Sequence, residues 1–432
     1  MTSTTDNTCG DQRSDNNLSG SHLLGGKGPD NEEPSSFQTY LCGVGASSLA
    51  QGLQIVLFPW LLVGALNESA LRVGYAQMAL MLPQLFFILI GGVVSDNRHL
   101  GHHLFRLYLF YCVPCLVLLV AVWQGYLSFE LMLLFGICFG TVTAFIQPAR
   151  ESLLSQVADH QLQQAVAKAS FIQFSAQSIG IVLAGYMDYV GLLILIALQI
   201  IFLLSSGWLL RKCLSAEPSQ IYQKKQSTWK NMTAGLSVVR GDTRLRQLMM
   251  VVAATGFLGF GLYLVAMPIL TREVYQQGAA FFAWIQFSFM FGVILSNIFI
   301  IRFIGRFTQP GRVLLLSLLI RGGFLVAIAM HPAPWLLFTL VVLWGMGSGV
   351  AMMLGRSMTH EESPQPYRAR VVSVYQLALF GAAPIGAWVS GHTITAIGVL
   401  PAIGVIGGLT ILAAIIAMVF SELWKPIKSN GV

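Results

Sequence analysis

The chain has 432 residues, of which 55% are hydrophobic and only 10% charged, and its formal net charge is +7. A soluble globular domain carries about 25% charged residues, so this composition excludes an ordinary soluble domain and indicates a membrane protein that crosses the bilayer repeatedly. The positive charge does not predict a nucleic-acid partner, because most Lys and Arg residues gather in alternate loops between apolar segments.

Residues 1–36 are rich in Ser, Asn, Asp and Gly and contain no apolar run, which predicts a disordered cytoplasmic tail without a signal peptide. After this tail follow apolar stretches long enough to cross a bilayer, which needs about 20 helical residues. When the longest stretches are divided at their turn signals, twelve transmembrane helices result. The predicted fold class is therefore an all-α integral membrane protein.

A single long polar segment, residues 213–246, separates the crossings into six and six. It divides the chain into an N-terminal six-helix bundle (37–212) and a C-terminal six-helix bundle (247–424), with a short cytoplasmic tail at 425–432. Within the linker, residues 229–239 place apolar residues at helical spacing between basic ones. This pattern predicts an amphipathic helix on the inner leaflet, the alternative being a flexible linker.

The basic residues predict the orientation of the chain. With the N-terminus inside, only Arg72 and Arg272 fall in outward loops, while the inward loops hold nearly all other Lys and Arg residues. This positive-inside bias predicts a multi-pass protein of the cell inner (cytoplasmic) membrane with both termini in the cytoplasm.

The two predicted halves repeat each other. The fifth helix contains Ile179-Gly180 and then Gly185, and the eleventh contains Ile385-Gly386 and then Gly391. The fourth and tenth helices each carry spaced glycines and end at an arginine of the inner face, Arg150 or Arg356. Duplicated six-helix halves are typical of transporters that rock around a site at the membrane midplane.

The loop after the second helix carries the first family resemblance. Gly92 is followed four residues later by Asp96, then by Arg98 and the run Gly101-His102-His103. This loop resembles the signature of the major facilitator superfamily, although Asn97 stands where that family has Arg. The resemblance implies a fold of two pseudo-symmetric six-helix bundles and a conformational latch, meaning charged residues that hold the two halves together on the inner side. The predicted latch comprises Gly92, Asp96, Arg98, Arg150, Glu151, Arg356 and Arg370. The alternative is a solvated basic loop that serves only topology.

A second resemblance is more specific. The segment Gln147-Pro-Ala-Arg150 after the fourth helix, and Arg368-Ala-Arg370 at the entry to the eleventh, are similar to the enterobactin-exporter-like branch of this superfamily. The resemblance covers roughly residues 37–424 and implies an exporter of a siderophore or drug. One departure concerns the antiport mechanism, because Gly180 is followed by Ile181 where exporters often have Pro.

Polar residues inside the predicted helices point to a binding surface. Every Asp and Glu falls at a helix end or in a loop, whereas one arginine and several amides lie mid-helix. Ionisable groups at membrane depth are functional candidates, and in the resembled family the first, fifth, eighth and eleventh helices line the substrate cavity. The predicted substrate-binding residues are Gln51, Gln54, Gln173, Gln177, Gln286, Arg321 and Gln376. For any one amide the alternative is a packing hydrogen bond between helices, and for Arg321 it is snorkelling or structural pairing.

A cavity with amides and a cation but no carboxylate suits a polar or anionic chelator better than a lipophilic cation. The sequence therefore predicts a secondary transporter that exports a siderophore-type metabolite, driven by protons. Multidrug or macrolide efflux and a transport-inactive membrane sensor or scaffold are the alternatives. An enzyme is not expected, because no nucleophile–base spacing or deep carboxylate pair occurs. The expected partners are a small-molecule substrate, protons and the lipid bilayer, for a monomer without nucleic acid, cofactor or metal.

Overall fold

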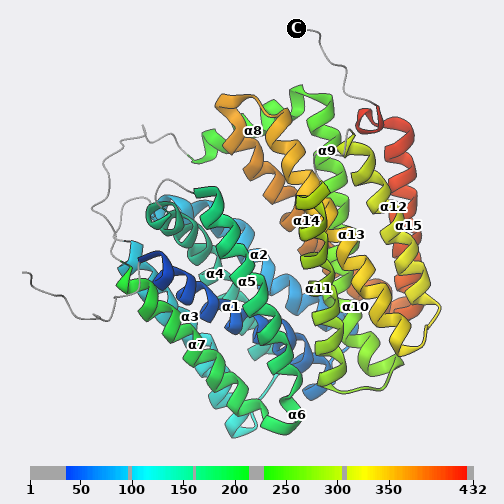
Figure 1. The fold of residues 1–432 in the computed structure, drawn as a ribbon. Coiled ribbons are helices and arrows are strands. Elements are labelled where there is room, and N and C mark those ends of the chain that lie inside the picture. Colours follow the sequence, from blue (N-terminus) through cyan, green and yellow to red (C-terminus); the bar gives the residue numbers. More distant parts are fainter. Residues whose placement is uncertain (1–35, 96–99, 159–161, 214–227, 304–308, 426–432) are drawn as a thin grey trace, which may run out of the picture. The chain divides into compact units, whose positions relative to one another are not determined.

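The computed structural model describes residues 36–95, 100–158, 162–213, 228–303 and 309–425, and these ranges are almost entirely helical (Figure 1). Eleven described segments are long and apolar enough to cross a membrane. The helix α2 (Ala70–Ser95), 26 residues long, is the twelfth. The predicted all-α membrane fold is confirmed.

The first half contains the crossings up to residue 212. Helix α1 packs against α5 and α7, α2 packs against α4, and α3 packs against α4 and α7. The elements of this half are α1 (Ser36–Trp60), the π-helical η1 (Leu61–Ala65), α2, α3 (Leu100–Gln124), α4 (Phe129–Val157), α5 (Leu162–Gly185), the short α6 (Met187–Val190) and α7 (Leu192–Lys212).

Helix α9, which leads into the second half, begins at Thr243, inside the segment predicted as linker, because Asp242 caps a helix there. The Asp242 carboxylate Oδ1 accepts hydrogen bonds from the backbone N–H groups of Arg244 (2.8 Å) and Leu245 (2.9 Å), which is an N-cap. The elements are α9 (Thr243–Ala254), η2 (Thr255–Phe260), α10 (Gly261–Ile269), η3 (Leu270–Val274), α11 (Ala279–Phe303), α12 (Pro310–Ala329), α13 (Pro334–Glu362), η5 (Gln365–Tyr367), α14 (Arg368–Ile397), α15 (Val399–Phe420) and η6 (Glu422–Trp424). In this half α11 packs against α13, α12 against α13 and α15, and α14 against α9, η2 and α10.

Helix α8 (Thr228–Gly241) lies in the predicted linker and packs against α14. The approach is close at Gly235, where an added Cβ atom would lie 2.7 Å from the carbonyl oxygen of Arg370. A glycine allows the two backbones to meet there. Contact between α8 and the membrane surface stays a prediction.

The two halves repeat each other in register. Residues 209 positions apart have equivalent roles, as at Asn67 and Gln276, which both adopt positive φ (56° and 51°) after a π-helical segment. Gly52 and Gly261 each lie against the backbone of the fifth membrane helix of their own half. Gly52 meets α5 at Gly180, and Gly261 meets α14 at Gly386. Further pairs of this spacing are Pro59 with Pro268, and Gly136 with Gly345. The duplication predicted from the glycine pattern thus has a structural counterpart.

The halves meet through α2 with α14 and through α5 with α11. We call the end of the bundles where α6 lies the α6 end, and the opposite end, with α8, the α8 end (Figure 1). A Cβ atom added to Gly74 would lie 2.8 Å from the Ala387 carbonyl oxygen, and one added to Gly185 would lie 2.8 Å from the Ala283 Cβ. Both contacts lie at the α6 end, so small residues close the two halves against each other there.

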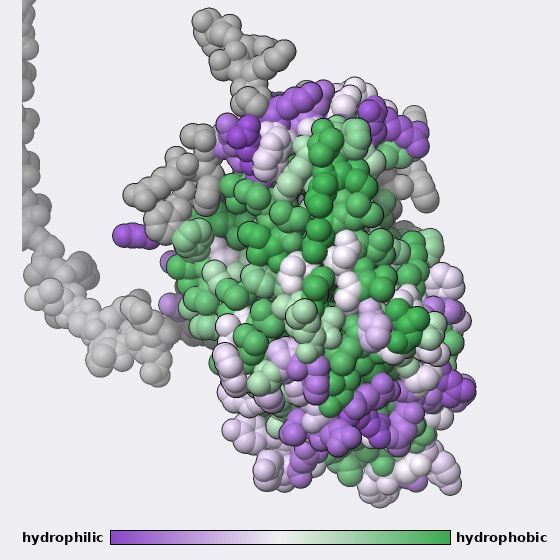
Figure 2. All heavy atoms as spheres, turned by 90° about the vertical axis from the view of Figure 1, so that its right-hand side faces the viewer, coloured by the Kyte–Doolittle hydropathy of each residue, from purple (hydrophilic) through white to green (hydrophobic). Residues whose placement is uncertain are grey.

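The surface over α12 and α15 has the hydropathy of a membrane protein. Figure 2 shows hydrophobic residues over its middle and hydrophilic residues gathered toward both ends. On α15 the exposed apolar side chains recur at helical spacing, at Val405, Leu409, Leu412 and Ile416. Lipid chains are the natural cover for such a belt.

Candidate functional site

The charged groups of the described helices are distributed as the sequence predicts. The described acidic residues all lie at or near helix ends, at Glu68, Glu130, Glu151, Asp188, Asp242, Glu273, Glu361, Glu362 and Glu422. By contrast, two arginines are buried among the described residues, Arg150 and Arg321, each with 3% relative exposure. A buried guanidinium requires hydrogen-bond partners, because it has lost its hydration.

Arg321 lies near the middle of α12 and is held by hydroxyl groups of two other helices. Its Nη2 donates to the Thr255 hydroxyl (3.1 Å) and its Nη1 to the Ser348 hydroxyl (3.4 Å). Its Nε is buried and has no partner. Thr255 begins the π-helical turn η2, and such turns are frequent at functional sites. Neither ion pair among the described residues involves Arg321, so no carboxylate there neutralises it.

Arg150 lies in α4 and joins a predicted latch residue to a predicted binding amide. Its Nη2 donates to the Oε1 atoms of Gln147 and of Gln173 on α5, both at 3.2 Å. Gln147 in turn donates from Nε2 to Glu151 (3.0 Å), so a hydrogen-bonded chain links the buried cation to an exposed carboxylate. Arg150 Nη1 is buried without a partner. All these residues belong to the first half.

Two predicted binding amides lie inside the helix packing of their own half. Gln54 of α1 accepts a hydrogen bond from Gln199 of α7 (2.8 Å). Gln286 of α11 accepts one from the Tyr263 hydroxyl of α10. Gln54 and Gln286 are 6% and 3% exposed, so in this conformation they connect helices and do not face a solvent-filled space.

The other predicted amides, Gln51, Gln177 and Gln376, are half-buried. They form no hydrogen bond with another described residue. The structure does not bring all seven predicted residues into one cluster: Gln173 lies with Arg150, whereas Arg321 lies in the other half with Thr255.

Sequence reasoning missed two glutamines of the membrane interior. Gln199 of α7 is 1% exposed, and Gln77 of α2 is 2% exposed, 209 residues before Gln286. The same signal, an amide within an apolar run, would have found both. Tyr263, Thr255 and Ser348 had no such signal, because hydroxyl groups are common in membrane helices.

The predicted latch is only partly described. Gly92 lies in the last turns of α2, and Asp96 and Arg98 lie outside the described residues. Arg356 and Glu151 are exposed near the α8-end termini of α13 and α4, and the Arg370 guanidinium lies 5.3 Å from the ring centroid of Tyr367. The latch stays a prediction.

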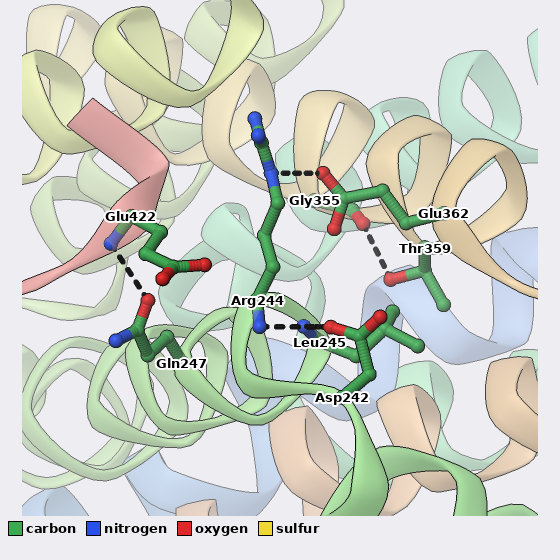
Figure 3. Close-up of polar contacts among 8 residues, drawn as sticks. All are labelled: Asp242, Arg244, Leu245, Gln247, Gly355, Thr359, Glu362 and Glu422. Atoms are coloured by element: carbon green, nitrogen blue, oxygen red, sulfur yellow. Dashed lines mark hydrogen bonds and ion pairs between the residues drawn. The ribbon is translucent and has the colours of Figure 1, made fainter. Parts of the chain in front are cut away.

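A polar network joins α9, α13 and the C-terminal segment at the α8 end (Figure 3). Arg244 Nε and Glu362 Oε1 form an ion pair of 2.6 Å. The Gln247 side-chain oxygen accepts the backbone N–H of Glu422 (2.8 Å), which ties the segment after α15 to α9. Sequence reasoning missed this network because its members are far apart in the chain. It connects three segments of the second half at the α8 end.

Twelve membrane helices in two repeated halves, which pack on each other through small residues and bury polar groups at mid-membrane, define a membrane transporter of the major facilitator fold. The model of the family described as "transmembrane secretion effector" matches residues 35–430. The chain therefore belongs to this family of the major facilitator superfamily, and it is a transport protein and not an enzyme.

Solved transporters share the fold at low sequence identity. The nucleoside transporter NupG is similar at a TM-score of 0.74 and 11% identity, over 90% of this chain and 99% of that one. The D-xylose-proton symporter is similar at 0.68 and 13% identity, over 90% and 97%. An inward-facing bacterial homologue of the human lysosomal transporter Spinster is similar at 0.65 and 14% identity, over 91% and 97%. No curated protein sequence matches the chain.

Proposed function

We propose that the protein is a secondary active transporter that exports a small polar or anionic metabolite, of the siderophore type, by alternating access. The observation that carries the proposal is Arg321, which is 3% exposed at mid-membrane and pairs with no acidic residue that the structure describes. In a low-dielectric interior a cation without a counter-charge favours an anionic ligand. A substrate carboxylate or catecholate would supply that charge.

The chemistry of the guanidinium fits this class of ligand. An arginine presents a planar fork of donors that binds two oxygens at once, and Nε of Arg321 has no partner in the described structure. The half-buried amides Gln51, Gln177 and Gln376 would serve the polar groups of the same substrate. A lipophilic cation would find no described carboxylate at this depth, which disfavours the multidrug alternative.

Export and proton coupling are further parts of the proposal. The Pro-Ala-Arg150 segment resembles the siderophore-exporting branch, and the matching family is described by secretion. Because the described carboxylates lie at helix ends, proton coupling would use peripheral groups such as Glu130 or Asp188, or the ionisation of the substrate itself. An added Cβ at Gly278 would lie 3.0 Å from the Asp188 carboxylate, which places this acid where the first half meets α11.

We further propose that the α8 end faces the cytoplasm of a cell inner membrane, with both termini inside. The described Lys and Arg residues are abundant at that end, whereas Arg72 and Arg272 are at the other. Reporter fusions at Gln124 and Pro332 are expected to indicate the outside, and fusions at Gly101 the inside. The domain boundaries 37–212, 213–246 and 247–424 belong to this proposal, as does the inner-side latch.

The test is a deletion strain starved of iron, in which secreted chelator and resistance to lipophilic cations are measured together. Loss of chelator secretion with unchanged drug resistance supports the proposal. Restoration should be partial with Arg321→Lys, which keeps the charge but loses the fork, and nearly absent with Arg321→Gln. Unchanged secretion with increased drug sensitivity would replace the siderophore by drug efflux, and no change in either would favour a sensor or scaffold. Membrane abundance of each variant is the control.

A further inference from the structure

Helix α7 presents an apolar face that no other described helix covers. It packs against α1 and α3 on one side. On its other side, exposed apolar residues recur at intervals of seven, three and four positions, at Ile194, Ile201, Leu204 and Trp208. This face therefore lies toward the lipid, as in other outward-facing membrane helices.

The α8 end of this face carries a shallow groove that is largely open to its surroundings. A groove of about 360 Å³ is lined by Leu204, Ser205, Trp208 and Leu209. The one hydroxyl in this lining, Ser205, already donates to the Ile201 carbonyl oxygen (2.7 Å). The groove thus offers mainly apolar surface, which an acyl chain would cover.

Two cations lie at the end of α7 directly after the groove residues. The Lys212 ammonium lies 3.6 Å from the centroid of the Trp208 ring, and the Arg211 guanidinium lies 5.2 Å from that of Phe105 on α3. Both cations are exposed, and neither takes part in the ion pairs of the described residues. Their charge is therefore available to a ligand at the membrane surface.

The first turn of α1 adds to the positive field. Cys213, directly after Lys212, donates from its thiol to the Ser36 carbonyl oxygen (3.5 Å), and burial raises the pKa of this thiol to about 11, so it stays protonated. The contact places the N-terminus of α1, a 25-residue helix, beside the end of α7. A helix N-terminus carries a partial positive charge.

We propose that this groove is a binding site for an anionic phospholipid, whose acyl chain lies against Leu204 and Trp208 and whose headgroup phosphate pairs with Lys212 and Arg211. Charge complementarity selects the anionic lipid: a zwitterionic headgroup would bring its own ammonium to the same two cations. Basic residues between membrane helices, next to an interfacial tryptophan, bind anionic headgroups in this way. The proposal does not depend on the transported substrate.

The test is native mass spectrometry of the purified full chain in detergent, titrated with phosphatidylglycerol or phosphatidylcholine of identical acyl chains. The wild-type protein should retain phosphatidylglycerol preferentially. Each basic residue near an anionic headgroup contributes about a fivefold change in binding, so Arg211→Gln with Lys212→Gln should weaken phosphatidylglycerol binding roughly 30-fold and leave phosphatidylcholine unchanged. Trp208→Ala should weaken both lipids.

Arg302→Gln is the matched control, because Arg302 is exposed in the last turn of α11, away from the groove. It should leave both affinities unchanged. Equal retention of the two lipids by the wild-type protein, or unchanged phosphatidylglycerol binding in the double variant, would overturn the proposal. So would an equal loss in Arg302→Gln, which would indicate general surface charge. Displacement of the lipid by equimolar glycerol phosphate would overturn the acyl-chain part. Unchanged melting temperatures show that the variants fold.

Discussion

Replacement of Gly74 by alanine should prevent full closure of the two halves at the α6 end. The added Cβ would lie 2.8 Å from the Ala387 carbonyl oxygen of the other half, whereas ordinary contact begins at 3.4 Å. Helices α2 and α14 must therefore separate by about 0.6 Å. The atoms that the new Cβ would meet belong to the backbone of Ala387 and Gly391, so no side-chain rotation can relieve the contact. Overpacking of this kind costs about 1–3 kcal/mol. Since the cost falls only on the closed state, the ratio of closed to open molecules should fall about 5- to 150-fold.

Distances between spin labels measure this ratio. Tyr126 and Met330, which are 76% and 79% exposed, lie at the α6 end of opposite halves and can be replaced by labelled cysteines after removal of the native ones. Gly74→Ala should move the distance distribution toward longer values. The matched control is Gly259→Ala, whose added Cβ would meet no atom within 4 Å.

Gly391→Ala tests the same contact from the α14 side, because its added Cβ would lie 2.8 Å from the Ala70 carbonyl oxygen of α2. It should shift the distances in the same direction. If both variants fold, insert normally and keep the wild-type distances, the halves do not close through α2 and α14, and the reasoning is refuted.

Three further outcomes are expected. Gln54→Leu should lower the free energy of unfolding by about 1–3 kcal/mol, because it leaves Gln199 buried and unpaired. The double variant Gln54→Leu with Gln199→Leu should recover most of the loss. Additive losses in thermal melts would contradict a direct pair. Arg244→Gln should lower the free energy of unfolding by a similar amount, about 1–3 kcal/mol, because it leaves the Glu362 carboxylate without its cation. Glu362→Gln in the same background removes that unpaired charge and should restore part of the stability. No recovery would show that the ion pair contributes little. Asp96→Asn should slow transport in proteoliposomes at normal expression, as expected of a latch charge, and wild-type rates would leave only a topological role for its loop.

The amino-acid sequence by itself determined the membrane class and the twelve helices. Both depend on hydropathy summed over about 20 neighbouring residues, a local property. The duplication was also predicted from the chain, because the glycine pairs Gly180 with Gly185 and Gly386 with Gly391 recur in the same order. The residue that each glycine contacts could not be predicted from the chain. Gly180 faces Gly52 within its own half, whereas Gly185 faces Ala283 of the other half.

Only the tertiary structure decided which polar groups satisfy one another. The sequence offered Gln54, Gln173 and Gln286 as equivalent mid-helix amides, but their partners are an amide of α7, the buried Arg150 and a tyrosine hydroxyl. These partners lie between 23 and 145 residues away along the chain. A side chain's period along a helix shows which face it occupies, but the helix packed against that face is selected by the fit of all the helices together, and therefore no local pattern contains it.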